Sequence, residues 1–345
     1  MLQRPEIFKM NNQSTNVSQQ LLADLPIVHI EKIRQNDREE LEIMLQAGRK
    51  YGFFYVDLRH ESCQAFLADR QHTLQFMEGY FSCSVEDKMK DYRDSDTHGY
   101  KPVGTTAGSL SDRRDNFENL KISYNDMSAK TSSLPATVLE EYDLLSRFQK
   151  FCHEACLAIL SGLSSALDLH GDDCLTLKHR HNQPTPSTLA LFRYPQQEKQ
   201  PDNIGHKKHT DMGTLTFLLC EQWGLQLLLP DTNTWHWIEP HPGHAIVNVG
   251  DGLRFMSGNR LLSAVHRVLP RNGQYQDSHR YSIVYFLRPE YDVTYCNAAG
   301  ESFTAEEWQL RKFSAFRRMN KQLEDDSFLC GGMEYQGTWT GNVNS

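Results

Sequence analysis

A series of short strand patterns between residues 187 and 290 restricts the fold of this chain more than any other feature. Each segment is rich in Leu, Val, Phe or Thr, and turn sequences such as Pro242-Gly243 and Ser257-Gly258 separate the segments. Short, evenly spaced strands of this kind predict a jelly-roll barrel that is open to a ligand at one end. Ahead of the barrel, residues 136–169 carry apolar side chains at spacings of three and four, which predicts a long amphipathic helix packed along the sheet.

The same patterns divide the chain into four segments and predict an α+β fold. Residues 1–24 are polar and lack periodicity, so we expect a flexible N-terminal arm. Residues 25–180 alternate strand and helix patterns and form an N-terminal region. Residues 181–325 hold the jelly-roll domain, with a last helix at 304–323 covering it, and residues 326–345 are expected to form a C-terminal tail.

Composition narrows the range of partners. The 345-residue chain has a formal charge of −8. Proteins that bind nucleic acids usually carry an excess of positive charge, so this charge argues against nucleic acid as a main partner. No run approaches the roughly 20 apolar residues that a membrane helix needs. The 8 cysteines form no Cys-x-x-Cys motif, and the chain starts without an apolar secretory segment. We therefore expect a cytoplasmic protein with reduced thiols that acts on a small molecule.

Three residues of the barrel are candidates for metal ligands. Thr and Leu alternate with Phe over residues 209–219, which predicts one strand, so His209 and Asp211 point to the same face. His266 lies in another apolar run, 55 residues further along the chain. Two imidazoles and one carboxylate that leave the other positions of a metal open match the facial triad of non-haem Fe(II) oxygenases.

A second pair of residues in the barrel, Arg280 and Ser282, also shares one strand face. A guanidinium that points inward needs an anionic partner, and a carboxylate matches its planar fork. Ser282 adds a hydroxyl donor. Taken alone, Arg280 is better explained as a surface residue of an edge strand; beside three metal ligands, we expect it to bind an acid.

Apolar residues on the same two faces are candidates for the substrate pocket. Phe217 and Leu219 continue the face of the first two metal ligands, and Val284 and Phe286 continue the face of the arginine. Packing in the barrel core is the alternative for all four. The loop at 103–113 is a further candidate for lining the pocket, with a plain surface loop as its alternative.

Other residues of ligand type are given structural interpretations. His170-Gly171-Asp172 repeats the His-x-Asp motif but follows a helical stretch and contains glycine, which indicates a helix end and turn. His206 is flanked by glycine and lysines, which favours a solvated loop. Asp251 is expected to be a turn carboxylate.

These motifs together resemble those of the Fe(II)/2-oxoglutarate-dependent dioxygenases, in the branch that includes isopenicillin N synthase, over most of residues 25–325. The resemblance implies a double-stranded β-helix (jelly-roll, cupin-like) core flanked by helices. The family's His-x-Asp…His motif falls on His209, Asp211 and His266 as ligands of Fe(II), and its Arg-x-Ser motif falls on Arg280 and Ser282 as the 2-oxoglutarate site.

The strand at 192–195 carries a further part of the resemblance. Tyr194 matches the tyrosine of the family's Asn-x-Tyr motif and is expected to help bind 2-oxoglutarate, whereas Phe192 stands where relatives often have the Asn. The resemblance implies that 2-oxoglutarate and O₂ are consumed, with succinate and CO₂ released. It also implies hydroxylation, desaturation or ring rearrangement of a small molecule of specialised metabolism, in the manner of fungal members.

Two other functions remain open at this point. One is an iron-dependent oxidase of the isopenicillin N synthase type, in which Arg-x-Ser binds the substrate or another small anion and 2-oxoglutarate is not used. The other is a non-catalytic barrel that binds a small molecule. The intact triad disfavours the second, because a pure binding protein has no need of an open redox site.

Overall fold

The computed structural model describes residues 21–105, 115–196, 205–271, 278–296, 300–317 and 331. Most of the expected arm at 1–24, most of the expected tail at 326–345 and most of the candidate loop at 103–113 therefore lie outside the described residues. The strands are β1 (Ile27–His29), β2 (Phe53–Asp57), β3 (Gly99–Lys101), β4 (Glu118–Ser123), β5 (Thr188–Tyr194), β6 (His206–His209), β7 (Leu215–Leu219), β8 (Leu225–Leu229), β9 (Thr234–Trp237), β10 (His244–Val249), β11 (His266–Val268), β12 (Arg280–Leu287), β13 (Thr294–Cys296) and β14 (Ser302–Thr304).

Most helices lie among or directly after the first four strands, whereas α8 lies between β10 and β11 and α10 follows β14. They are α1 (Ile30–Arg34), α2 (Arg38–Lys50), α3 (Gln64–Ser82), α4 (Val85–Met89), α5 (Tyr124–Ala129), α6 (Ala136–Glu140), α7 (Tyr142–Ala166), α8 (Asp251–Met256) and α10 (Ala305–Arg317), with short 3₁₀ turns at Glu61–Cys63, Gly171–Asp173 and Leu175–Lys178. The expected helix at 136–169 is thus two helices, because Glu141 leaves the helical conformation with ψ +23°.

Two sheets face each other to form the barrel. The large sheet has the order β1-β2-β10-β7-β12-β5-β4-β3, and the small sheet has the order β6-β11-β8-β9. This arrangement, with helices outside it, confirms the predicted α+β fold with a double-stranded β-helix core. Strands β1 to β4 come from the expected N-terminal region at 25–180, so both regions contribute to one sheet.

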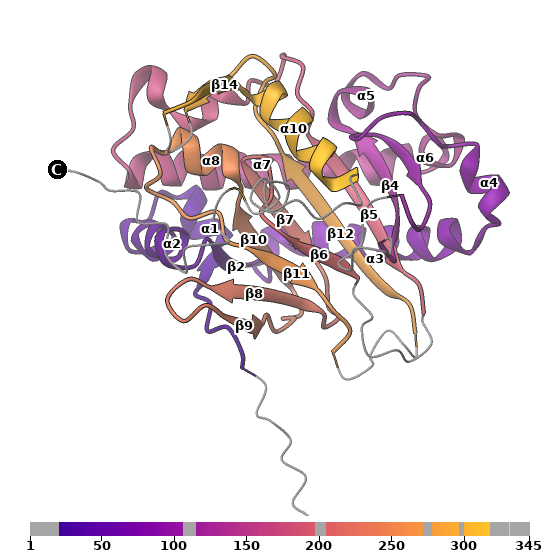
Figure 1. Cartoon of the computed structure of the whole chain (residues 1–345), viewed down its shortest axis with the longest axis horizontal. Helices are drawn as coiled ribbons and strands as arrows, with labels where there is room; N and C mark the ends of the chain where they lie inside the picture. Colours follow the sequence, from indigo (N-terminus) through magenta and orange to yellow (C-terminus); the bar gives the residue numbers. More distant parts are fainter. Residues whose placement is uncertain are drawn as a thin grey trace, which may run out of the picture.

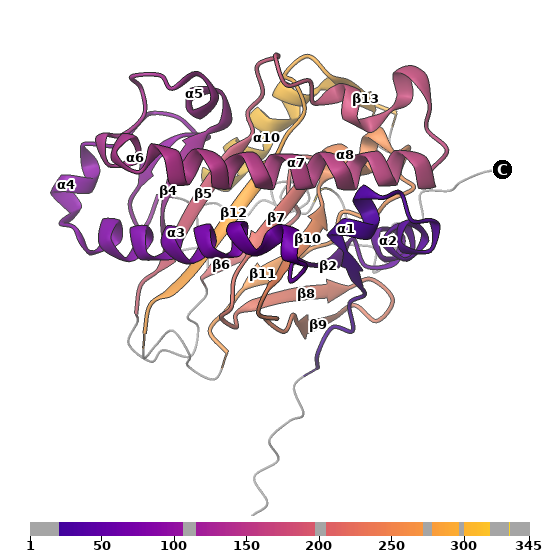
Figure 2. The ribbon, with the colours of Figure 1, turned by 180° about the vertical axis from the view of Figure 1, so that it is seen from behind.

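The two faces of the large sheet bury different cores, because side chains alternate along each strand. On β12, Ile283, Tyr285 and Leu287 join a core cluster with residues of α7 and α3. Val284 faces the other way, into a cluster between the two sheets that also holds Leu225 and Leu227 of β8. Figure 2 shows α7 and α3 lying across the outer side of the large sheet, which leaves the inner side for a ligand.

Helix α10 covers the opposite side of the sheet from α7 (Figure 1). Its described part begins at Ala305, which agrees with the start expected from the sequence, and residues 318–323 of the expected helix lie outside the described residues. The ring centroid of Phe316 lies 5.5 Å from that of His209, so α10 closes the barrel next to the candidate metal ligands.

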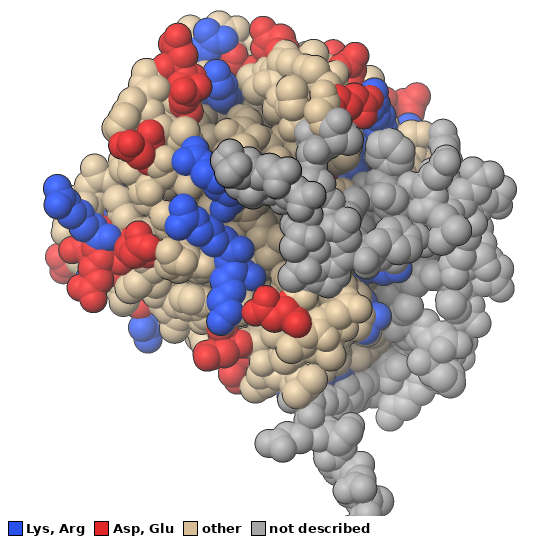
Figure 3. Space-filling view, turned by 60° about the vertical axis from the view of Figure 1, so that its left-hand side comes forward, with Lys and Arg blue, Asp and Glu red and all other residues tan. Residues whose placement is uncertain are grey.

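The helices and the surface of the described residues have the following properties. Within the described ranges, no helix is long and apolar enough to cross a bilayer. On the face shown in Figure 3, acidic side chains lie beside the basic ones, so this face is not a continuous basic surface. The seven cysteines in the described part of the chain are all free thiols.

Candidate metal centre and adjoining cavities

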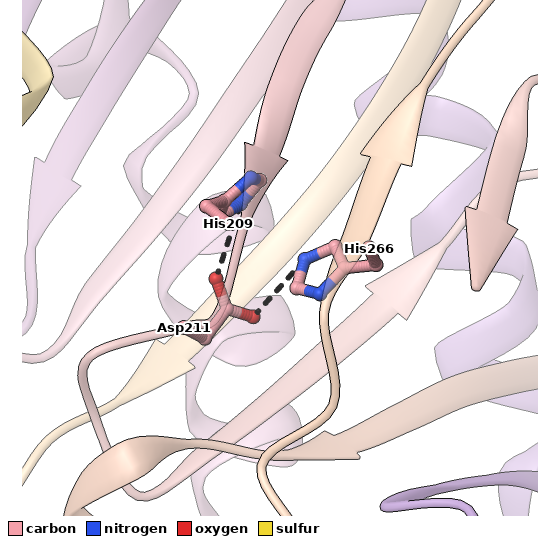
Figure 4. Close-up of side chains that lie close together, drawn as sticks. All are labelled: His209, Asp211 and His266. Carbon is pink, nitrogen blue, oxygen red and sulfur yellow. Dashed lines mark ion pairs between the residues drawn. The ribbon is translucent and has the colours of Figure 1, made fainter. Parts of the chain in front are cut away.

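The small sheet and the loop after it bring the three expected metal ligands together. β6 ends at His209 and β11 begins at His266, and these two residues pair across the ladder. Asp211 follows β6 by two residues, in the loop that leads to β7. The ligand atoms of the three buried side chains lie within 4.8 Å of one another, and Figure 4 shows the carboxylate turned toward both imidazoles.

The prediction of one strand over 209–219 is wrong, and with it the placement of two pocket residues. Residues 210–214 cross from the small sheet to the large sheet, so the alternation of faces is not carried from Asp211 to β7. Phe217 and Leu219 consequently pack in the core on the helix side. Their neighbours Thr216 and Leu218 line the cavity at the triad instead.

Both imidazoles are oriented by backbone carbonyls. His209 Nδ1 lies 2.7 Å from the carbonyl oxygen of Lys207, and His266 Nδ1 lies 3.1 Å from that of Ala264. When Nδ1 carries the proton and donates these bonds, Nε2 keeps its lone pair for a metal. Burial lowers the pKa of His266 to about 4, so this imidazole is neutral near pH 7, as a ligand must be.

The Asp211 carboxylate is also held in place. Its Oδ2 accepts a bond of 2.5 Å from Thr216 Oγ1 and one of 2.8 Å from Asn248 Nδ2. Burial opposes ionisation, but the two imidazoles and these donors outweigh it, and the pKa of Asp211 stays well below its usual range. Its Oδ1 lies 3.6 Å from Nε2 of His209, and its Oδ2 lies 3.8 Å from Nε2 of His266.

These distances fit a single ion. Two ligands with metal bonds of about 2.1 Å lie no more than about 4.2 Å apart, and both carboxylate–imidazole distances fall below that limit. The whole set lies within 4.8 Å, so a bound ion would need only small shifts of the ligand atoms. The donor set of two neutral imidazoles and one ionised carboxylate suits Fe(II) and leaves coordination positions for other molecules. The residues present therefore fit the metal that the sequence motif implies.

Arg280 lies in the same cavity, with 1% of its surface exposed. Its Nε donates to the carbonyl oxygen of Trp223 at 2.9 Å, and its guanidinium carbon lies 4.9 Å from the centre of the Tyr194 ring. Arg280 and Tyr194 are paired residues of β12 and β5. Ser282, the next residue on this face, also lines the cavity.

Tyr194 belongs to the same polar group. Burial raises the pKa of Tyr194 to about 12, so its hydroxyl remains a neutral donor, while Arg280 and Ser282 act in the opposite direction. Phe192 lies opposite Ser282 across the β5–β12 ladder and lines the cavity. Val284 and Phe286 line it as well, as expected from the unbroken alternation of β12.

Gly224 gives the arginine its space. This residue has φ +139°, and a Cβ atom added to it would lie 2.9 Å from Arg280 Nε. A larger residue would therefore both strain the backbone and displace the guanidinium. The sequence showed this glycine only as a strand neighbour, because its close contact comes from a strand 56 residues away.

The rival residues have the following places. His170 and Asp172 are exposed in and before a 3₁₀ turn, away from the triad, in agreement with the structural interpretation. His206 does not lie in a solvated loop: it belongs to β6, and its ring centroid is 4.3 Å from that of His209. Asp251 is not a simple turn residue, because it begins α8 and is fully buried.

Asp251 is part of a buried network that sequence reasoning missed. Its Oδ2 lies 2.8 Å from Lys312 Nζ of α10, and both side chains have no exposed surface. Lys312 Nζ also donates to Oγ1 and to the carbonyl oxygen of Thr210, the residue between His209 and Asp211. The sequence did not indicate this contact, because a single lysine in a helix such as α10 is ordinarily exposed to solvent.

A larger cavity also adjoins the triad. Its volume is about 210 Å³, and it shares His209, Asp211, Phe192 and Phe286 with the cavity of Arg280. Arg280 lines only the smaller cavity, so the candidate metal ligands stand where the cavity of Arg280 and the larger cavity meet.

Comparison with known proteins agrees with this arrangement. Residues 172–289 match the family model described as the 2OG-Fe(II) oxygenase superfamily. The oxidoreductase vrtI of Penicillium aethiopicum is 43% identical over 324 residues, which cover 92% of this chain and 78% of that protein. The 2-oxoglutarate-dependent dioxygenase frbH of Dothideomycetidae sp. (strain 11243) is 43% identical over 321 residues, covering 92% of this chain and 99% of the relative.

A solved structure supports the fold. A full-length Neurospora crassa protein in complex with α-ketoglutarate and thymine has a TM-score of 0.71 to this structure, with 20% identity, covering 84% of this chain and 96% of that one. The converging triad, the buried arginine beside it and these relatives lead to one conclusion: the chain belongs to the 2OG-Fe(II) oxygenase superfamily, as an Fe(II)- and 2-oxoglutarate-dependent dioxygenase.

Proposed function

We propose that His209, Asp211 and His266 bind Fe(II) through Nε2, a carboxylate oxygen and Nε2. The neutral imidazoles and the ionised carboxylate supply the required lone pairs, and the bonds to Nδ1 and to Oδ2 fix their orientation. Fe(II) bound here supplies the redox chemistry by which O₂ is reduced at the expense of 2-oxoglutarate and substrate.

The second part of the proposal concerns the co-substrate. Arg280 and Ser282 bind the carboxylate of 2-oxoglutarate that is remote from the metal, and Tyr194 donates a further hydrogen bond from its neutral hydroxyl. All three line the cavity that also contains the metal ligands. The guanidinium is held by Trp223 before ligand binds, which reduces the entropy lost on binding.

The third part concerns the substrate, a small molecule of specialised metabolism that occupies the larger cavity. One molecule of 2-oxoglutarate and one of O₂ are consumed per turnover, and succinate and CO₂ are released. In a hydroxylation, one oxygen atom of O₂ enters succinate and the other enters the substrate. Desaturation and ring rearrangement are the other outcomes expected for this class. The expected cytoplasmic location and the placement in the branch of isopenicillin N synthase stay predictions.

One observation supports the assignment more than any other: a buried guanidinium lies in the same cavity as the triad. A buried cation is costly unless an anion or a set of acceptors compensates it, and 2-oxoglutarate offers a carboxylate at one end and metal-binding oxygens at the other. A metal centre without the arginine would not favour a dicarboxylic co-substrate.

The test is the stoichiometry of turnover with purified protein, Fe(II), 2-oxoglutarate and O₂, screened against a library of small natural products as candidate substrates. We expect succinate to form only when substrate is present, in an amount equal to the 2-oxoglutarate consumed. In Asp211→Ala, neither succinate formation nor 2-oxoglutarate consumption should occur. The matched control is Asp172→Ala, which removes an exposed aspartate from the other His-x-Asp motif and should leave turnover intact. Product formed in full without 2-oxoglutarate would instead favour the iron-dependent oxidase.

A further inference from the structure

The larger cavity carries charged groups that neither the metal nor 2-oxoglutarate explains. At 10–15 Å³ per water-sized site, its volume of about 210 Å³ corresponds to roughly 15–20 such sites, enough for a small organic molecule. Its lining includes Arg288, Lys121 and Asn119, which come from the end of β12 and from β4. The lining also includes the aromatic side chains of Phe192, Phe286 and Phe313, and the guanidinium carbon of Arg288 lies 4.9 Å from the centre of the Phe286 ring.

Arg288 is buried, with 5% of its surface exposed. Its Nη1 donates to the carbonyl oxygen of Pro186 at 2.6 Å and to Thr188 Oγ1 at 3.3 Å, and both acceptors are neutral. Its Nε is buried and has no hydrogen-bond partner among the described residues. The edge formed by Nε and Nη2 is thus the part of the guanidinium that remains for a ligand, and this edge fits the two oxygens of a carboxylate.

Lys121 brings a second positive charge to the same cavity. Its Nζ donates to the carbonyl oxygen of Asp96 at 2.8 Å and lies 5.7 Å from the centre of the Phe313 ring. Burial, and next to it the charge of Arg288, lowers the pKa of Lys121 to about 7. The lysine therefore lies in a place where a nearby anion would favour its charged form.

The carboxylates of Asp96 and Asp211 line the cavity and act on these two groups from a distance, but they form no ion pair with either. Asp96 forms an ion pair with Arg317, and Asp94 also lines the cavity. Among the described residues, the side-chain hydrogen bonds of Arg288 and Lys121 go to backbone carbonyl oxygens and one threonine hydroxyl, and neither residue forms an ion pair with a carboxylate. A ligand carboxylate placed between Arg288 and Lys121 would pair with the guanidinium and favour the charged form of the lysine.

Asn119 adds a polar group of the opposite kind. It lies two residues before Lys121 on β4, so both side chains point to the same face of the strand. Its Oδ1 is buried and has no hydrogen-bond partner among the described residues. The cavity thus offers a planar cationic fork, a lysine ammonium and one acceptor oxygen.

We propose that the substrate is a small carboxylic acid whose carboxylate binds to Arg288 and Lys121, while Asn119 Oδ1 accepts a hydrogen bond from a donor elsewhere on the molecule. This proposal rests on the proposed function, because it names the substrate class of the same site. Arg280 is the first residue of β12, and Arg288 directly follows its last residue. The two are eight residues apart, which places them on the same side of the strand and corresponds to about 26 Å along it. One strand then places an arginine for each of two acids, the co-substrate and the substrate.

The experiment measures binding by calorimetry. A panel of alkyl and aryl carboxylic acids is compared with the matching primary amides, using protein loaded anaerobically with Fe(II) and 2-oxoglutarate. At least one acid should bind roughly 10- to 100-fold more tightly than its amide, the effect of one charge-assisted hydrogen-bonded pair. Arg288→Met should reduce that ratio to about one, and Arg288→Lys should restore part of it.

The controls separate this proposal from loss of the fold and from a general charge effect. Lys121→Met should lower the acid-to-amide ratio without touching the hydrogen bonds of Arg288 to Pro186 and Thr188. Arg147→Met removes the same charge from an exposed pair with Asp69 on the outer helix layer and should leave the ratio unchanged. The proposal is wrong if no acid is preferred by wild-type protein, or if the preference survives both Arg288→Met and Lys121→Met.

The same measurements distinguish failure of this proposal from failure of the proposed function. The absorption band of the Fe(II)–2-oxoglutarate complex is recorded for each protein before titration. A normal band without a preference for acids refutes the substrate class alone. A missing band refutes the proposed function, and the titration is then repeated on metal-free protein, where an acid preference that depends on Arg288 would still support the cation pair as an acid site.

Discussion

Replacing Lys312 with methionine is expected to weaken the fold and metal binding together. Lys312 Nζ lies 2.8 Å from Asp251 Oδ2, and neither side chain has exposed surface. Removing one partner of such a pair leaves a buried charge uncompensated, which costs about 3–5 kcal/mol in the free energy of unfolding. The backbone N–H of Asp251 donates to the carbonyl oxygen of Asp211 at 2.7 Å, and Lys312 binds Thr210, so the loop that carries the metal ligand loses support.

The expected loss of metal affinity is roughly 10-fold, the lower end of what groups that orient metal ligands contribute. Urea-induced unfolding of metal-free protein measures the first effect, and titration with Co(II) as an Fe(II) substitute measures the second. The matched control is Arg311→Met on the same helix. Arg311 forms a pair of 2.9 Å with Glu301 whose side chains are 40% and 52% exposed, so its loss should cost less than about 1 kcal/mol.

A double variant completes this test. Lys312→Met combined with Asp251→Leu removes both charges, so it should be less destabilised than Lys312→Met alone. The reasoning is refuted if Lys312→Met loses no more stability than Arg311→Met. If stability falls but Co(II) affinity stays at the wild-type value, the pair supports only the fold and does not position the metal loop.

Three further predictions concern the co-substrate, the carboxylate ligand and pH. Arg280→Met should weaken 2-oxoglutarate binding by about 2–4 kcal/mol, with Fe(II) affinity little changed, in an anaerobic titration; an unchanged 2-oxoglutarate affinity would contradict the role of this arginine. Asn248→Ala removes the 2.8 Å bond to Asp211 and should lower metal affinity by roughly 10-fold, whereas equal affinity would mean that the remaining Thr216 bond suffices. Burial lowers the pKa values of His153 and His179 to about 4, below the value of about 6.5 in the unfolded state. Between about pH 4 and pH 6.5 the unfolded state therefore binds more protons than the folded state. The free energy of unfolding should therefore fall as pH drops, by about 2 kcal/mol per histidine between pH 7 and pH 5, and urea midpoints that stay level or rise over this range would show that these imidazoles are not held neutral.

The sequence predicted those parts of the site that depend on regular alternation. Along β12 the alternation is unbroken, so Arg280, Ser282, Val284 and Phe286 were correctly placed on one face. The triad was also correctly grouped, although Asp211 reaches it from a loop and not from the strand that the pattern indicated. The spacing of two between His209 and Asp211 correctly predicted that they lie together, but the loop after β6, and not the alternation of a strand, brings them together.

Other parts depend on contacts between distant segments, which alternation cannot predict. Phe217 and Leu219 were misplaced because the chain changes sheets at 210–214. Gly213 lies in this segment and was a turn signal, but the apolar alternation on either side was given more weight. Lys312 was missed because a lone lysine in an amphipathic helix ordinarily lies in solvent. Arg288 was missed because only the fold shows that its partners are neutral.

The most direct test of the central claim is an anaerobic titration of metal-free protein with Fe(II) in the presence of 2-oxoglutarate, followed by visible absorption. We expect a charge-transfer band that saturates at one Fe(II) and one 2-oxoglutarate per chain, disappears in Asp211→Ala and requires far more 2-oxoglutarate in Arg280→Met. A band that persists in Asp211→Ala, or none in wild-type protein, would contradict the assignment of these residues to one metal and its co-substrate.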